Sequence, residues 1–179
     1  MGDTRRQNLL QRFFAGLAEQ TFQTRLGVAD PPLVDYISRL LVRFVHADVI
    51  YRIRDLAGRR LLEVADMLVE AQQRMGEARR EAHRHVGDYI LFWSGVYPET
   101  LARLQHRDRK DSLLDYNTHG KRAYWIAGTI PSESDDAEGD VLLRLSDGFE
   151  LCQYGLREVR RQWESRGGEG DDVTTLLIN

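Results

Sequence analysis

The chain has 179 residues, of which 42% are hydrophobic and 30% are charged, and its net charge at pH 7 is −3. This composition excludes a disordered or membrane-embedded chain, and the negative net charge gives no general attraction to nucleic acid. The single cysteine, Cys152, excludes an intramolecular disulfide and a zinc site built from cysteines. The first residues lack the apolar stretch of a secretory signal. We therefore expect a cytoplasmic protein with a single core.

The first two predicted helices are separated by a break that contains prolines. Apolar residues at helical spacing predict a first helix that includes Leu10 and ends near Leu26. Asp30 followed by Pro31 is a helix-start signal. A second apolar stripe begins there and predicts a helix that continues to about residue 54.

The longest apolar pattern in the chain extends from residue 61 to residue 96, at alternating steps of three and four. This spacing is typical of a helical face that is buried. A straight helix through it would be about 54 Å long, which is long for a domain of this size, so we expect a bend or break near Gly76. A break would give two antiparallel helices, whereas an unbroken helix would offer a surface for self-association. The residues of this seam are Leu61, Val64, Leu68, Ala71, Met75, Ala78, Ala82, His85, Tyr89, Phe92 and Val96.

The second half of the chain predicts further helices. A short helix is expected over 99–107, and Ser112 precedes a stripe that runs from Leu113 to Ala127. Small residues in this stripe would let another helix approach closely. The acidic segment 132–140 is expected to be a solvated loop. Apolar residues at the same three-four spacing then predict one last core helix over 142–163.

Together these patterns predict an all-α fold. Residues 1–166 are expected to form a single-domain, largely up-and-down bundle of about five to seven helices. Residues 167–179 are expected to form a Gly-rich acidic spacer and a short apolar tail. The apolar tail is a candidate partner-binding segment that could add to a sheet edge or dock in a groove, and the alternative is that it packs on its own bundle or frays. Its candidate contact residues are Val173, Leu176, Leu177 and Ile178.

Glu81, His85 and Asp88 are the candidate metal ligands of the sequence. They occupy positions i, i+4 and i+7, which places two carboxylates and an imidazole along one side of a helix. His85 also lies in the apolar seam, where burial would keep its imidazole neutral and able to bind a metal or haem iron. The alternative is a core histidine bonded to a polar group, with both acids on a solvated face and paired with residues such as Arg84. The paired Glu-x-x-His motif of dinuclear bundle proteins is absent.

Other titratable residues give weaker indications of a site. His46 could face His85 across the bundle, while His83 and His106 lie among arginines and are expected to be exposed. Cys152 occupies a seam position, so its thiol is expected to be buried and unreactive. The sequence contains no nucleophile elbow, phosphate-binding loop, dinucleotide fingerprint or H-E-x-x-H motif.

These observations favour an intracellular, non-catalytic helical-bundle module that acts through contacts with another protein or with itself, as a homo-oligomer. This interpretation implies no cofactor. The alternative is a metal- or haem-dependent helical-bundle enzyme that uses His85, with Glu81 and Asp88 as ligands or orienting groups. Basic clusters are interleaved with acids, so neither nucleic-acid binding nor membrane binding is expected.

Overall fold

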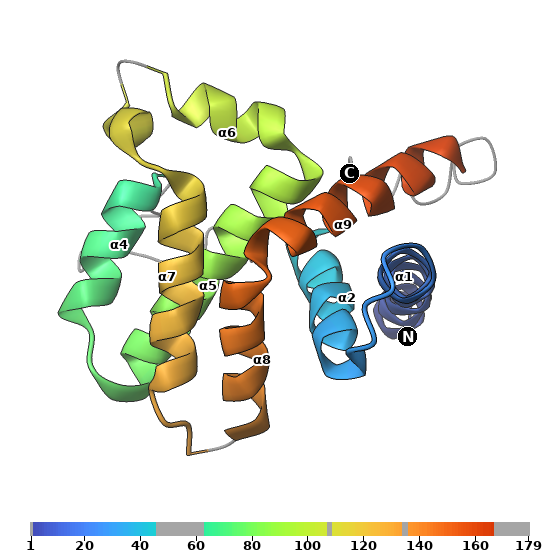
Figure 1. Ribbon diagram of the computed structural model, residues 1–179, viewed down its shortest axis with the longest axis horizontal. Helices are drawn as coiled ribbons and strands as arrows, with labels where there is room; N and C mark the ends of the chain where they lie inside the picture. The colour runs from blue at the N-terminus through green and yellow to red at the C-terminus, as the bar shows by residue number, and fades with distance from the viewer. Residues whose placement is uncertain (1, 46–62, 107–108, 134–135, 167–179) are drawn as a thin grey trace.

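The computed structural model describes residues 2–45, 63–106, 109–133 and 136–166, and these residues form helices joined by short connections (Figure 1). No strand occurs among them, which confirms the predicted all-α class. The elements in chain order are α1 (Gly2–Glu19), the π-helix η1 (Gln20–Arg25), α2 (Pro31–Val45), α4 (Val64–Gln73), α5 (Gly76–Val96), α6 (Pro98–Leu104), the 3₁₀ helix η2 (Lys110–Leu113), α7 (Tyr116–Thr129), α8 (Asp136–Asp147) and α9 (Phe149–Ser165).

The break between α1 and α2 lies where the sequence predicts it. The backbone of Gly27 has φ +67°, a left-handed conformation that glycine adopts without steric cost. Asp30 then accepts a hydrogen bond from the Leu33 amide at 3.2 Å, which satisfies one of the free N–H groups at the start of α2. The predicted continuation of the second helix to residue 54 lies outside the described residues.

The long seam is broken at the predicted position, which resolves the choice between one helix and two. Gly76 has φ +54°, and the chain is extended at Arg74 and Met75, so α4 ends before α5 begins. The predicted burial of Met75 is wrong, because this residue stands in the extended connection and its side chain is 85% exposed. Ala71 and Ala82 are buried as predicted, whereas the predicted burial of Ala78, in the first turn of α5, is wrong because this residue is exposed.

Helix α5 is the central element of the bundle. It packs against α4, α7 and α9, and its residues from Ala82 onward are buried on nearly every side. Small residues allow the helices around α5 to pack closely against one another. A Cβ at Gly120 of α7 would lie 2.5 Å from the ring of Phe149, the first residue of α9. The predicted close packing along this stripe is therefore confirmed at Gly120. Leu113 is an exception, since it lies in η2 and is 95% exposed.

The single last helix predicted over 142–163 is wrong. The chain forms two helices, α8 and α9, with Gly148 between them in a non-helical conformation. Because α8 begins at Asp136, the expectation that all of 132–140 is a loop is also wrong. Figure 1 shows α8 beside α7, whereas α9 turns away and crosses toward α1. The apolar spacing continues through the break because both helices bury the same face in one core, where Leu142, Leu145 and Leu156 are fully covered.

None of the helices in the described part of the chain combines the length and the apolar character that a membrane span requires.

Candidate functional site

The three predicted metal ligands lie on α5 in different surroundings. Glu81 pairs with Arg84 at 2.7 Å, while the buried His85 ring lies against Phe44, with ring centroids 6.1 Å apart. Asp88 is bonded within a separate cluster that involves α2 and α7. In the described ranges no three His, Cys, Asp or Glu side chains are grouped as a metal site requires. The structure therefore does not bring the three residues together, and metal binding by them stays a prediction.

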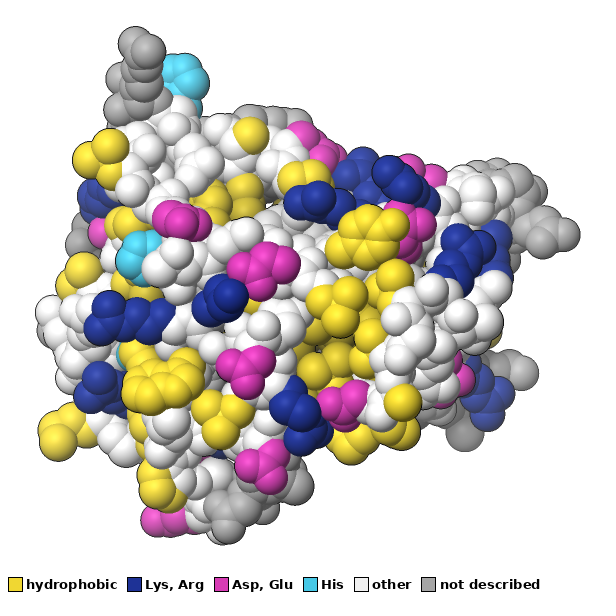
Figure 2. Space-filling model, in the orientation of Figure 1, with side chains coloured by type: hydrophobic (Ala, Val, Ile, Leu, Met, Phe, Trp, Pro, Cys, Tyr) yellow, Lys and Arg dark blue, Asp and Glu magenta, His cyan; other side chains and the backbone are white. Residues whose placement is uncertain are grey.

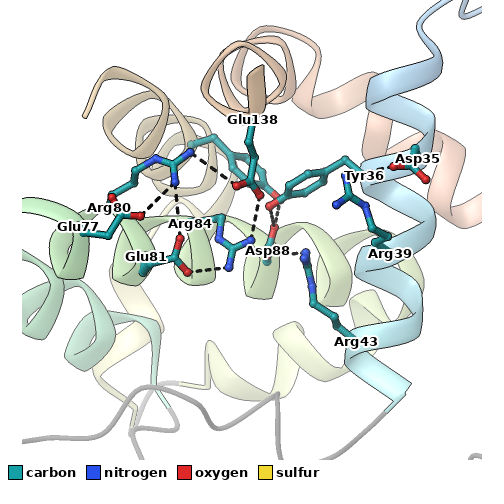
Figure 3. Close-up of polar contacts among 11 residues, drawn as sticks. Asp35, Tyr36, Arg39, Arg43, Glu77, Arg80, Glu81, Arg84, Asp88 and Glu138 are labelled. Carbon is teal, nitrogen blue, oxygen red and sulfur yellow. Dashed lines mark hydrogen bonds and ion pairs between the residues drawn. The ribbon is translucent and has the colours of Figure 1, made fainter. Parts of the chain in front are cut away.

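Asp88 is the centre of a buried hydrogen-bond cluster (Figure 3). Its Oδ1 accepts from the hydroxyl of Tyr36 at 2.7 Å and from that of Tyr124 at 2.8 Å, and its Oδ2 accepts from Arg43 at 2.9 Å. The expectation that Asp88 lies on a solvated face is wrong, since the residue is only 4% exposed. Asp88 and Glu81 lie two turns apart on the same side of α5, but α2 and α7 supply bonds only to Asp88.

The two phenols of this cluster are hydrogen-bond donors to Asp88. Burial raises the pKa of Tyr36 and of Tyr124 well above the ordinary value, and the charge of Asp88 raises both further. Each hydroxyl therefore keeps its proton near neutral pH. Both tyrosines are at most 1% exposed, so a substrate has no access to their hydroxyls in this structure. The cluster joins three helices and offers no reactive group to solvent.

A second group of charges joins α5 to α8. The Arg80 side chain is only 2% exposed and lies 3.4 Å from Glu77 and 3.7 Å from Glu138. Arg84 bridges Glu81 and Glu138, the latter at 3.0 Å. Figure 3 shows these side chains in a row along α5, with Glu138 reaching them from the neighbouring helix. The predicted pairing of Glu81 with Arg84 is confirmed, but it belongs to an inter-helix network and not to an isolated surface pair.

His83 is buried, although its arginine-rich context predicts exposure. It is 1% exposed, and neither ring nitrogen has a hydrogen-bond partner within the described residues. Burial lowers the pKa of His83 to about 4, and the charges of Arg79 and Arg122 act in the same direction. The imidazole is therefore neutral at physiological pH. Helical periodicity misses its burial because α5 is enclosed on both faces.

Cys152 is buried as predicted. Its side chain is 2% exposed, and burial raises the pKa of the thiol to about 12. The nucleophilic thiolate is therefore not populated near neutral pH. His46 and the tail residues Val173 to Ile178 lie outside the described residues.

A pocket of about 370 Å³ opens where α5, α6, α7 and α9 meet. Its volume is within the range of small-molecule sites. The wall combines apolar side chains of α6 with polar side chains of the other three helices. Its lining residues are Ser94, Pro98, Leu101, Ala102, Gln105, Asp115, Tyr116, Asn117, Gln153 and Arg157.

Gln153 is the most deeply placed amide in this pocket. It is 6% exposed, and its Nε2 donates to Ser94 Oγ at 2.7 Å and to Asn117 Oδ1 at 2.8 Å. Both amide donors are therefore used, while no hydrogen bond reaches its Oε1 from the described part of the chain. Oε1 is therefore an acceptor available to a bound molecule.

The pocket lining suits recognition better than bond-breaking chemistry. The lining residues include no histidine, cysteine or lysine. Ser94 accepts from Gln153 and is not paired with a base, and the Tyr116 hydroxyl donates to Asp111 at 2.9 Å. The other contacts of the Asp111 carboxylate are the first backbone amides of α4. A nucleophile activated by an adjacent base is therefore absent from this lining.

The outer face of α9 carries two hydrophobic side chains. Leu151 and Tyr154, three residues apart, are 47% and 49% exposed. Figure 2 shows hydrophobic side chains gathered below α9 on the face of the molecule that is in view. Such a surface is a candidate for contact with another protein.

No protein-family model, curated protein or solved structure matches this chain.

Proposed function

We propose that the chain is a non-catalytic helical-bundle module that binds a small molecule in the pocket between α5, α6, α7 and α9. The observation that carries this proposal is Gln153, a buried amide that lines the pocket and has a free acceptor oxygen. The buried charged side chains support the same interpretation, because Asp88 is hydrogen-bonded to α2 and α7, Arg80 lies 3.7 Å from Glu138 of α8, and neither residue lines this pocket.

A small-molecule screen on the full chain tests this proposal. Ala102 is exposed and lines the pocket, so Ala102→Trp should fill the pocket without disturbing the core. Ala78→Trp places the same side chain on an exposed position of α5 away from the pocket lining and is the matched control. We expect the screen to find compounds that raise the melting temperature of the wild type and of Ala78→Trp but not that of Ala102→Trp. A screen in which no compound distinguishes the two variants would contradict the proposal.

A second function, self-association through α9, is favoured by the exposure of Leu151 and Tyr154. In this proposal a second copy of the chain covers the two side chains across a two-fold axis. Light scattering over a dilution series should then show a dimer at high micromolar concentration, and Leu151→Glu should be monomeric. A wild-type chain that stays monomeric at that concentration would rule this function out.

A further inference from the structure

Two opposite charges line the pocket without pairing with each other. Asp115 lies at the start of α7, where its carboxylate accepts from the Thr118 amide at 3.3 Å and from the Thr118 hydroxyl at 2.8 Å. Arg157 of α9 forms no hydrogen bond or ion pair with another residue in the part of the chain that the structure describes. The pocket therefore presents one carboxylate and one guanidinium, and no ion pair joins these two groups.

Both groups are charged at neutral pH. Hydrogen bonds from the Thr118 side chain and backbone lower the pKa of Asp115, and an arginine guanidinium stays protonated throughout the ordinary pH range. The carboxylate oxygens of Asp115 have further acceptor capacity beyond the two bonds to Thr118. A ligand with a single charge would satisfy one of these groups and leave the other unmatched.

The remaining lining residues define what lies between the two charges. Gln153 offers the acceptor Oε1, and Asn117, whose Oδ1 is already bonded, keeps its amide N–H groups as donors. Pro98 and Leu101 supply an apolar wall on α6. This combination matches a small zwitterion with an aliphatic side chain.

We propose that the pocket binds a free α-amino acid with an aliphatic side chain. Arg157 binds its carboxylate, Asp115 binds its ammonium group, and Leu101 contacts its side chain. This inference rests on the proposed function, since it names the ligand class of the same pocket.

Calorimetric titration of the full chain with L-leucine, leucinamide and N-acetyl-leucine tests the inference. Leucinamide lacks the carboxylate and N-acetyl-leucine lacks the ammonium group. We expect leucine to bind, and each blocked analogue to have a Kd about tenfold weaker or more, which corresponds to about 1.4 kcal/mol. Analogues that bind as tightly as leucine would overturn the inference.

Two variants assign each charge to its residue. In Arg157→Gln, leucine should lose its advantage over leucinamide, and in Asp115→Asn it should lose its advantage over N-acetyl-leucine. Asparagine replaces aspartate well at the start of a helix, so the second variant keeps the cap of α7. Arg161→Gln is the matched control, because Arg161 lies one turn further along α9, is exposed and pairs with Glu158. Loss of leucine binding in this control would also overturn the inference.

The outcome separates this inference from the proposed function. If library compounds bind in a manner that Ala102→Trp abolishes but leucine does not bind, the zwitterion inference fails and the pocket remains a ligand site. If neither leucine nor any library compound binds, both fail.

Discussion

Asp88 is a carboxylate in the interior of the protein, and such a group is costly unless its charge is fully bonded. Two phenols and one guanidinium supply those bonds from two other helices. Arg43 is partly exposed, with 27% of its side chain accessible, so the cluster reaches solvent on that side. The geometry is specific to one arrangement of α2, α5 and α7, because each helix contributes at least one member.

Removal of the Asp88 carboxylate should therefore be severe. Asp88→Ala leaves two buried hydroxyls and Arg43 without their acceptor, and we expect the free energy of unfolding to fall by about 3 to 5 kcal/mol. Tyr124→Phe removes one donor and should cost about 1 to 2 kcal/mol. Urea denaturation measures both losses. The control Asp35→Ala breaks an exposed pair with Arg39 and should change stability by less than about 1 kcal/mol. Equal losses of unfolding free energy in Asp88→Ala and Asp35→Ala would show that the buried cluster stabilises the fold no more than an exposed ion pair does.

His83 should make the protein sensitive to mild acid. Its pKa is about 4 in the folded state and about 6.5 in an unfolded chain, so the unfolded state binds a proton more readily between these values. The stability from the neutral imidazole is present above pH 6.5 and is lost as the pH falls toward 4.

We expect His83→Leu to remove about 1 to 3 kcal/mol of the stability difference between pH 7 and pH 4, because leucine has no charged form. Thermal denaturation as a function of pH measures it. His106→Gln alters an exposed histidine and serves as the control. If the stability of both variants depends on pH in the same way as that of the wild type, protonation of His83 does not cause the loss of stability in acid.

At this scale the sequence predicts some environments and misses others. Burial of His85 and Cys152 follows from the apolar seams, because both stand at core positions of a helical repeat. The burial of Asp88 and His83 does not follow from the sequence, because it depends on neighbouring helices that cover a polar face of α5. Periodicity within one helix carries no information about those neighbours.

At the scale of elements, the helix breaks at Gly76 and Gly148 differ in whether the sequence predicts them. The break at Gly76 is predicted because an unbroken helix would be too long for the domain. The break at Gly148 is missed because the apolar spacing continues from α8 into α9 without a change of phase. Apolar residues at steps of three and four therefore identify the buried face of a helix, but they do not show where the helix axis changes direction.

Gly76 and Gly16 give a matched test of these backbone arguments. No atom lies within 4 Å of a Cβ built at either position, so neither substitution by alanine creates a clash. Gly76 has positive φ, and Gly76→Ala should destabilise the protein by about 1 kcal/mol. Gly16 lies inside α1, so Gly16→Ala should stabilise it by about 0.5 to 1 kcal/mol. Chemical denaturation of both variants should give opposite signs, and a shared sign would contradict the explanation.

At the scale of the whole molecule, polar groups have two separate roles. The hydrogen bonds of Asp88 and the ion pairs of Arg80 and Arg84 with Glu138 join α5 to neighbouring helices. The pocket around Gln153 keeps an unbonded acceptor and unpaired charges near solvent. The sequence predicts the all-α fold but not this pocket, because its lining comes from four helices and no short motif contains it.

The most direct test of this division is chemical-shift mapping by NMR on the full chain. Isotope-labelled protein is titrated with leucine and with the library compound that stabilises it most. We predict that the largest shifts occur at Ser94, Asn117 and Gln153, and that Tyr36 and Asp88 are unaffected. Largest shifts at Tyr36 and Asp88, with none at the pocket, would contradict the account.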